Sequence, residues 1–358
     1  MKTGIQPRGT VTNECEMQEL KQQVRSEDNP LGEHQLVDVD AMNAIGQAMI
    51  DVEARLMAVA HASGPASDAI AHLVASGGKR IRPRLTLLIA GTCDHFDGNF
   101  PVELAVASEL IHSASLLHDD VIDEGVQRRG IPTSRMVYSN TVSVLAGDHC
   151  LASAVEMIRS VDTGDVLAES LRSVQDLVHG ELLQLQTRGK LQVDEDLYRK
   201  ICLLKTASLF VWAARAGARS AGATELQLEA VGHLATNLGL AFQMRDDLLD
   251  ISGDERFGKR LLDDLREGRM TLPVILAVRK NPELGRHLER MFNSTEELSA
   301  DELNGFRARI EETGAIEVVA EQVWSLTREA LKDLQTLRQT PYRDLIESQI
   351  DMLGVRSI

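Results

Sequence analysis

The sequence is poor in cysteine, aromatic residues and positive charge. Its four cysteines lie far apart and form no Cys-x-x-Cys pair. That spacing is typical neither of a disulfide scaffold nor of a zinc site, and it predicts a reducing, cytoplasmic location. Lysine and arginine number 38 against 54 acids, a net charge of −16. A chain this acidic has no general attraction for nucleic acid or for an anionic membrane.

Long apolar runs and strand-like alternation are also missing. No apolar run reaches the roughly 18 residues that a membrane span needs. The N-terminus lacks the apolar core of a signal peptide, and its acids argue against a transit peptide. We therefore expect no membrane span. Hydrophobic residues still make up 43% of the 358 residues, which is enough for a globular core.

Apolar residues recur at intervals of three and four from Val39 almost to the C-terminus, which predicts helices. Residues 1–37 are polar and irregular, and we expect a flexible extension there, followed by one domain over 38–358. The predicted fold is an all-α, single-domain helical bundle with a buried central layer. Helices are expected at about residues 41–62, 102–123, 141–160, 165–188, 195–220, 225–251, 271–279, 300–312, 317–338 and 342–353.

Two acidic clusters carry the strongest functional signal. The segments LLHDDVIDEG and MRDDLLDISGD each place three aspartates at i, i+1 and i+4, near a predicted helix end. Carboxylates are disfavoured at the negative end of the helix dipole, and residues four apart share one face. A solvated acidic face would explain one cluster better than two. Divalent cations would relieve the repulsion, and oxygen ligands favour Mg²⁺. The six candidate ligands are Asp119, Asp120, Asp123, Asp246, Asp247 and Asp250.

Basic residues gather beside these acids although they are the minority charge. Arg128 and Arg129 follow the first cluster, and Lys259 follows the second. A further run, SGGKRIRPRL, contains Lys79 and Arg82, and a solvated helix start would explain this run alone. Together with the acids, the cations predict phosphate groups held by metal and by direct Lys or Arg contacts. We therefore expect two phosphorylated substrates, or one large one, in a cavity between two helices.

Five motifs occur in an order that resembles one enzyme family. They are GGKRIRPRL, DDVID with RRG, KTASLF, FQMRDDLLDISGD with GK, and DDLREGRMTLP. In this order they resemble the trans-type isoprenyl (polyprenyl) diphosphate synthases, from about residue 45 to the end. The resemblance implies a bundle of the isoprenoid synthase type with a central active-site cavity, a homodimer, and two or three Mg²⁺ ions. It also implies head-to-tail condensation of isopentenyl diphosphate with an allylic diphosphate.

The resemblance gives each matched residue a role. Four match the isopentenyl diphosphate site: Lys79, Arg82, His112 and Arg129. Three match the allylic diphosphate site: Arg128, Lys205 and Lys259. Thr206 and Gln243 match residues that place oxygen dipoles beside a developing carbocation. Arg269 stands where the family usually has lysine, which keeps the charge but changes the donor geometry. Independently, the spacing places His112 on the helix face of Asp119, and Gln243 on that of Asp247.

Product length is expected to depend on the residues upstream of Asp119, along which the growing chain would run. Short-chain members of the family typically have an aromatic floor near this point, and no aromatic lies between Phe100 and Asp119 here. We therefore expect products longer than C20, as in octaprenyl-type members, with a C15 or C20 product as the alternative. The small residues are Ala107, Ser108, Ala114 and Ser115, and Met157 or Ile158 are candidates for a deeper floor.

Three other functions share parts of the pattern. A class I terpene cyclase would carry a Ser or Thr in its second motif where DDLLDISGD has none, and would lack GGKRIRPRL. A non-catalytic partner subunit of a heteromeric synthase would not need the intact aspartates and cations. A di-iron bundle would need two Glu-x-x-His pairs, and Glu109 with His112 forms only one in the core helices. Mg²⁺-dependent release of diphosphate would separate the enzyme from an iron protein.

Overall fold

The computed structural model describes residues 38–62, 64–93, 95–161, 164–252, 262–293 and 299–355. The chain divides into Met1–Asp38 and Val39–Ile358, and only the second unit is discussed below. The expected extension over residues 1–37 lies outside the described residues.

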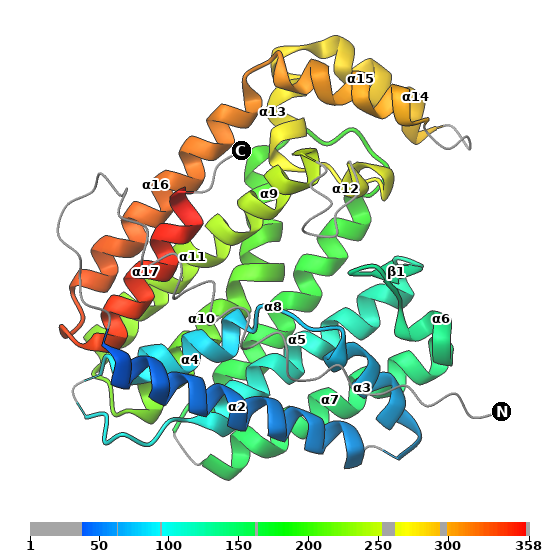
Figure 1. Cartoon of the computed structure of the whole chain (residues 1–358). Helices are drawn as coiled ribbons and strands as arrows, with labels where there is room; N and C mark the ends of the chain where they lie inside the picture. The colour runs from blue at the N-terminus through cyan, green and yellow to red at the C-terminus, as the bar shows by residue number, and fades with distance from the viewer. Residues whose placement is uncertain are drawn as a thin grey trace. The chain divides into compact units, whose positions relative to one another are not determined.

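Most described residues are helical, and the all-α prediction is confirmed (Figure 1). The first part contains α2 (Val39–Ala62), the 3₁₀ turn η1 (Gly64–Ala66), α3 (Ser67–Ala75), α4 (Ile81–Gly91), α5 (Val102–Ile122), β1 (Gln127–Arg128), β2 (Ile131–Pro132), α6 (Ser134–Tyr138), α7 (Asn140–Val161) and α8 (Val166–Thr187). The second contains α9 (Glu195–Cys202), the π-helical η2 (Leu203–Ala207), α10 (Ser208–Ser220), α11 (Glu225–Ser252), α12 (Asp263–Arg266), α13 (Leu272–Lys280), α14 (Pro282–Phe292), α15 (Ala300–Glu311), α16 (Ala315–Gln335) and α17 (Pro341–Val355).

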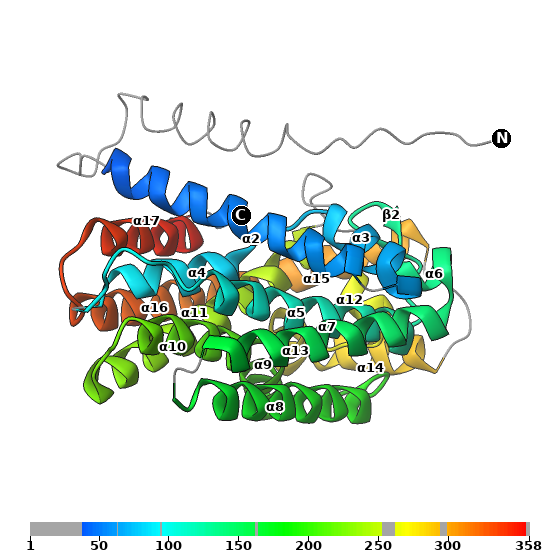
Figure 2. The ribbon, with the colours of Figure 1, turned by 90° about the horizontal axis from the view of Figure 1, so that it is seen from below.

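Helix α5 is enclosed by its neighbours and carries the first acid cluster at its end. It contacts α2, α4, α7 and α10. Figure 2 shows α2 on one side of the bundle and α8 on the opposite side, with α5 between them. Pro101 precedes the helix, where a missing backbone N–H costs little. Small side chains such as Ala105 and Ala107 are fully buried and allow the close packing around α5.

Helix α11 joins two hydrophobic clusters. Its first half, with Leu228 and Leu234, packs in the larger cluster together with residues of α2, α4, α5 and α10. Its second half, with Met244 and Leu248, packs in the smaller cluster together with residues of α9, α13 and α16. The second acid cluster lies in this second half, so one long helix fixes its aspartates relative to both parts of the core.

The π-helical segment η2 interrupts the helix that the sequence predicts over residues 195–220. A Cβ atom on Gly180 of α8 would lie 2.7 Å from the backbone nitrogen of Lys205. A Cβ atom on Gly239 of α11 would lie 2.6 Å from the Cα atom of Ala207. Only glycine permits these two approaches, so α8 and α11 both contact the backbone of η2. Single π-helical turns often occur at functional sites.

Several elements were not expected from the sequence. Besides η2, they are α3, α4, α6, α12, α14 and the short β1–β2 hairpin. For α14 a signal was present, because the Asn281 side chain caps the helix and Pro282 occupies its first position. The hairpin pairs Gln127 with Pro132 and Arg128 with Ile131. Strands of two residues are too short to show an alternation of polar and apolar side chains.

By length and mean hydropathy, two described helical stretches could cross a membrane. They are Asn140–Val161 and Glu195–Ser220. In the most apolar 18-residue part of each, 61% of the second is buried inside the bundle, as expected of a core helix, against 33% of the first. Asp148 and Glu156 lie within the first stretch.

Candidate active site

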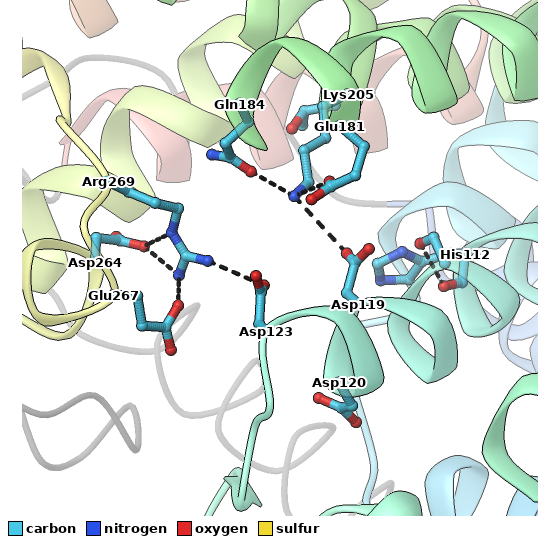
Figure 3. Close-up of polar contacts among 12 residues, drawn as sticks. His112, Asp119, Asp120, Asp123, Glu181, Gln184, Lys205, Asp264, Glu267 and Arg269 are labelled. Carbon is cyan, nitrogen blue, oxygen red and sulfur yellow. Dashed lines mark hydrogen bonds and ion pairs between the residues drawn. The ribbon is translucent and has the colours of Figure 1, made fainter. Parts of the chain in front are cut away.

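The aspartates of the first cluster meet cations that come from different elements (Figure 3). Asp119 faces Lys205 of η2, with 3.9 Å between Oδ2 and Nζ. Asp123 accepts hydrogen bonds from Arg188 Nη1 at 2.7 Å and from Arg269 Nη1 at 3.3 Å. Asp120 points away from both and accepts from Arg128 at 2.9 and 3.1 Å. The i, i+4 pair therefore faces the open space between the side chains in Figure 3, while the middle aspartate does not.

Lys205 is held in this space by α8. Its Nζ donates to Gln184 Oε1 at 2.6 Å and pairs with Glu181. Burial raises the pKa of Asp119 to about 6; Lys205 opposes this shift, and the nearby Glu181 and Asp123 add to it. The charged form of Asp119 is therefore disfavoured in the protein alone, and a cation placed beside it would stabilise that form.

Arg269 connects the two acid clusters. Its Nη2 contacts Asp264 Oδ1 at 2.7 Å, and its guanidinium also pairs with Glu267 and Asp123. The backbone N–H of Asp264 donates to Asp250 Oδ1 at 3.2 Å. A chain of contacts thus runs from the end of α5 to the end of α11. Burial opposes the charge of Arg269, but its acidic neighbours outweigh burial and raise its pKa.

The second cluster has a different environment. Asp247 is buried and accepts from Tyr198 Oη at 2.6 Å and from Gln243 Nε2 at 3.0 Å. Gln243 Oε1 in turn accepts from Thr206 Oγ1 at 2.8 Å. These partners are neutral, so burial raises the pKa of Asp247 to about 7, helped by the charge of Asp264. The contact between Gln243 and Asp247 confirms that the two share a helix face.

Cations also crowd around His112. Burial, followed by the charges of Arg82, Arg128, Arg129 and Arg80, keeps the pKa of His112 well below its usual value, so the ring is neutral at pH 7. Arg82 lies over the ring of Phe210 at 4.8 Å, and its Nε is buried without a hydrogen-bond partner. Burial lowers the pKa of Arg82 to about 10. An anion placed here would give Arg82 Nε the acceptor that it lacks and would be attracted by the neighbouring arginines.

Arg80 and Arg129 fix the glycine loop beside this group. Arg80 has a positive φ of 45°, and its side chain bonds Glu53 at 2.6 Å and Glu109 at 2.9 Å. Arg129 donates to the carbonyl of Gly77. Because Glu109 is engaged by Arg80, it does not join His112 at a metal, which argues against the di-iron interpretation.

Most of the predicted residues therefore fall into two groups, the acids with Lys205 and the cations around His112. Lys79 is exposed in the loop before α4, and Lys259 lies outside the described residues. Six further residues of the site were not predicted from the sequence: Glu181, Gln184, Arg188, Tyr198, Asp264 and Glu267. A signal existed for the first three, since polar residues at i, i+3 and i+7 share one face of the predicted 165–188 helix.

A cavity of about 450 Å³ lies elsewhere, between α8, α10 and α11. Its lining includes Leu204, Trp212 and Arg215 and contains none of the predicted residues. Of the two arginines in the lining, Arg215 is already paired with Glu169 and Arg172 is exposed, so the cavity has no cluster of cations like that around His112.

The donor set of the acid clusters fits Mg²⁺. Among the described residues, no three His, Cys, Asp or Glu side chains converge closely enough to hold a metal by themselves. Mg²⁺ rarely uses such a cage, because it binds one or two carboxylates and completes its shell with water and substrate phosphate. Asp119 and Asp123 supply hard oxygen donors on one face, and the raised pKa of Asp119 marks an unmet need for positive charge.

Comparison with known proteins decides the family. The sequence model of the polyprenyl synthetase family matches residues 65–305. The chain belongs to this family. An all-trans-nonaprenyl-diphosphate synthase (geranyl-diphosphate specific) from Rhodobacter capsulatus is 35% identical over 276 residues, covering 77% of this chain and 84% of that protein. Octaprenyl diphosphate synthase from Escherichia coli (strain K12) is 34% identical over 279 residues, covering 77% and 85%.

The fold of this polyprenyl synthetase agrees with its sequence. The crystal structure of a polyprenyl synthase from Caulobacter crescentus CB15, complexed with calcium and isoprenyl diphosphate, superposes with a TM-score of 0.78. It is 31% identical, and the match covers 91% of this chain and 100% of that one. The predictions of an isoprenoid-synthase bundle and of a prenyltransferase are both confirmed, and the terpene cyclase and di-iron alternatives are excluded.

Proposed function

We propose that residues 38–358 form a Mg²⁺-dependent synthase that condenses isopentenyl diphosphate head-to-tail onto an allylic diphosphate, giving a trans-polyprenyl diphosphate longer than C20. The observation that carries the proposal is the pairing of a carboxylate face, Asp119 and Asp123, with an adjacent group of cations in which Arg82 has a buried Nε without a hydrogen-bond partner. Two separate diphosphates need two such places, one metal-bridged and one held directly by Lys and Arg.

The allylic diphosphate occupies the space between the acid clusters in this proposal. Asp119, Asp123 and Asp246 hold the Mg²⁺ ions, and Asp120, Asp247 and Asp250 support them. Bound Mg²⁺ supplies Lewis-acid stabilisation of the departing diphosphate. Lys205 contacts that diphosphate directly, and Arg269 orders the acids on either side of it. Arg128, which the family resemblance assigns to the same diphosphate, is bound to Asp120 on the side of His112. The relative complexed with calcium and isoprenyl diphosphate supports a divalent cation in this fold.

In this proposal, isopentenyl diphosphate binds to the cations around His112. Lys79, Arg82 and Arg129 contact its phosphates, and His112 is a neutral hydrogen-bonding partner because its pKa is low. Arg82 Nε lacks a protein partner, so it is the donor that gains most from an anion.

The carbocation forms at the allylic carbon when its bond to the diphosphate breaks, and the isopentenyl double bond attacks it. Thr206 donates its hydroxyl proton to Gln243, which leaves the hydroxyl lone pairs available to the cation. Tyr198 and Gln243 both donate to Asp247, and this fixes the amide of Gln243. The resulting cation then loses a proton to the departed diphosphate, which restores an alkene. The reaction needs no side-chain nucleophile. The Thr206 hydroxyl and the Gln243 amide are neutral dipoles, which suits a role in stabilising the cation rather than in attacking it.

The growing chain runs along α5 away from the aspartates in this proposal. Ser108 and Ser115 lie on the same face of α5 as Asp119, because they precede it by whole numbers of helical turns. Ala107 and Ala114 lie on the adjacent face. None of the four can close the channel as an aromatic side chain would, and the relatives named octaprenyl and nonaprenyl synthases agree with a long product. Met157 and Ile158 pack against the larger cluster, where either can form a deeper floor.

We also propose a cytoplasmic homodimer. On α8 the exposed residues Leu171, Val178, Leu182 and Leu185 form one stripe, and α7 exposes Val144, Leu145 and Val155. An apolar face of this extent is typical of a subunit interface. Cys93, Cys150 and Cys202 are buried thiols rather than disulfides, which suits a reducing compartment. Light scattering of the purified protein tests the dimer, and a monomer that keeps full activity would contradict it.

Product analysis tests the reaction. The protein is incubated with Mg²⁺, labelled isopentenyl diphosphate and each of three allylic primers, and products are sized by mass spectrometry. We expect products beyond C20 from the native chain, and shorter ones from Ser115→Phe. Products that stop at C15 or C20 in the native chain would leave the chemistry intact but reject the open channel. No product with any primer would favour a chain that works only with a partner subunit.

A further inference from the structure

Arg188, directly after α8, links three separate parts of the site. Its Nη1 donates to Asp123 Oδ1 at 2.7 Å, at the end of α5. Its Nε donates to the backbone carbonyl of Glu267 at 2.8 Å, in the turn after α12. The guanidinium fork thus spans two partners that lie 65 and 79 residues away in the chain. Arg188 is only 31% exposed, so these contacts are shielded more than those of a surface pair.

The backbone beside Arg188 is tied to the same turn. The N–H of Gly189 donates to the carbonyl of Gly268 at 2.8 Å. Gly268 has a φ of +78°, and a Cβ atom there would lie 2.8 Å from the Gly189 nitrogen. Only glycine fits this conformation and this approach without a shift of the backbone. Arg188 and Gly189 are therefore fixed against Glu267 and Gly268 by a side-chain and a backbone hydrogen bond.

The turn fixed in this way also presents Arg269, which binds the other oxygen of the Asp123 carboxylate. Each oxygen of Asp123 thus receives one guanidinium, and the two segments that supply them are bonded to each other. A carboxylate has about four lone-pair positions, so two guanidinium bonds leave room for a cation on the same group. The arrangement orients Asp123 without blocking it.

We propose that Arg188 is a positioning residue that orients Asp123 for the metal-bridged diphosphate and holds the turn carrying Arg269 against α5. This deepens the proposed function and rests on its assignment of Asp123 as a metal ligand. Groups that orient a metal ligand typically contribute about 10- to 100-fold to metal affinity or activity. Lysine cannot reproduce the effect fully, because a single ammonium does not offer the two separated donors of the fork.

The test measures Mn²⁺ binding through the electron paramagnetic resonance signal of free Mn²⁺. An unreactive allylic thiodiphosphate is present, so the readout does not depend on turnover. We expect Arg188→Gln to weaken Mn²⁺ binding about 10- to 100-fold, and Arg188→Lys to give an intermediate loss. In the activity assay, the Mg²⁺ concentration for half-maximal rate should rise by a similar factor, with a smaller change in kcat at saturating Mg²⁺. Arg172→Gln is the matched control, because Arg172 is exposed on the same helix and should leave both values unchanged.

The outcomes separate the inference from the function beneath it. If the native protein binds no Mn²⁺ with the thiodiphosphate, the proposed metal site itself is rejected. If the native protein binds and Arg188→Gln binds equally well or more tightly, only the role of Arg188 is rejected. Should Arg188→Gln fail to fold, Gly268→Ala replaces it, because it displaces the same turn without removing a charge. Native-like Mn²⁺ affinity in that variant would equally overturn the proposal.

Discussion

The two acid clusters have the same sequence spacing, but the partners of Asp247 in the second differ from those of the first cluster. At the end of α5, Asp119, Asp120 and Asp123 each face a lysine or an arginine. On α11, Asp247 is bound by a phenol and an amide. Burial raises the pKa of both Asp119 and Asp247, but a lysine opposes this shift at Asp119, whereas only a phenol and an amide oppose it at Asp247. Equal spacing therefore does not mean an equal role, and the middle residue of each cluster supports its neighbours.

The largest expected effect concerns activity. Asp119→Asn should lower kcat by about 1,000-fold or more, because metal binding to a leaving group supplies several kcal/mol. Asp120→Asn and Asp247→Asn should lower kcat by about 10- to 100-fold, since both residues act through others. Steady-state assays at saturating Mg²⁺ provide the comparison. Equal losses in the three variants would remove the distinction between outer and middle aspartates.

Next in size is the effect of the close approach at η2. Gly239→Ala should lower the free energy of unfolding by about 1–3 kcal/mol, because its methyl group would meet the Ala207 backbone. Gly232→Ala is the matched control on the same helix, where the nearest side-chain atom would lie at 3.8 Å. That control should be neutral or stabilising by up to about 1 kcal/mol. Urea denaturation measures both, and the same loss in each would show that η2 is not specially constrained.

The charge of Asp119 should also affect the stability of the metal-free protein. Its folded pKa, about 6, exceeds the unfolded value, so its contribution is fully favourable below about pH 4 and is lost as pH rises through 6. Asp119→Asn should therefore stabilise the metal-free fold by about 2 kcal/mol at pH 8 and by about half as much at pH 5, because the unfolded carboxyl is already ionised there.

Lys205 and Arg128 favour the charge of Asp119, while Glu181 and Asp123 oppose it, and all four remain in that variant. Asp51→Asn, at an exposed position on α2, controls for the loss of one acid. Denaturation curves at pH 5 and pH 8 measure the free energy of unfolding of both variants and of the native chain. A gain that is the same at both would mean that burial does not disfavour the charge.

The smallest expected effect is at Tyr198. Tyr198→Phe removes the hydroxyl that donates to Asp247, so Gln243 becomes less firmly oriented. We expect kcat to fall about 10-fold with KM nearly unchanged, because substrate binding does not use this hydroxyl. Tyr138→Phe, on the short helix α6, is the control. An increase in KM alone would indicate a role in binding rather than in orientation.

Much of the fold could be predicted from the sequence, because the pattern of apolar residues is local. Periodicity predicted α5, α7, α8 and α11 to within a few residues. The π-helical turn at Lys205 could not be predicted in this way, because it depends on close contacts with Gly180 and Gly239 on two other helices. The hairpin after α5 also escaped, since two residues per strand carry no periodic signal.

The site could be predicted only in part. Repetition of the aspartate motif indicated the acids, and the order of the motifs indicated the cations. The partners that decide what each acid does were not visible, because Tyr198 and Arg188 meet their aspartates across 49 and 65 residues of sequence. Spacing along one helix correctly joined Gln243 to Asp247 and set Asp120 apart from Asp119, but it could not show that Arg128 is the partner of Asp120.

The most direct test of the difference between the clusters is a crystal structure with Mn²⁺ and the unreactive allylic thiodiphosphate, with the ions located by anomalous scattering. We expect Mn²⁺ peaks at Asp119, Asp123 and Asp246, with Asp120 still bound to Arg128 and Asp247 still bound to Tyr198. Direct Mn²⁺ ligation by Asp120 or Asp247, or an absence of Mn²⁺ at Asp119, would contradict the account.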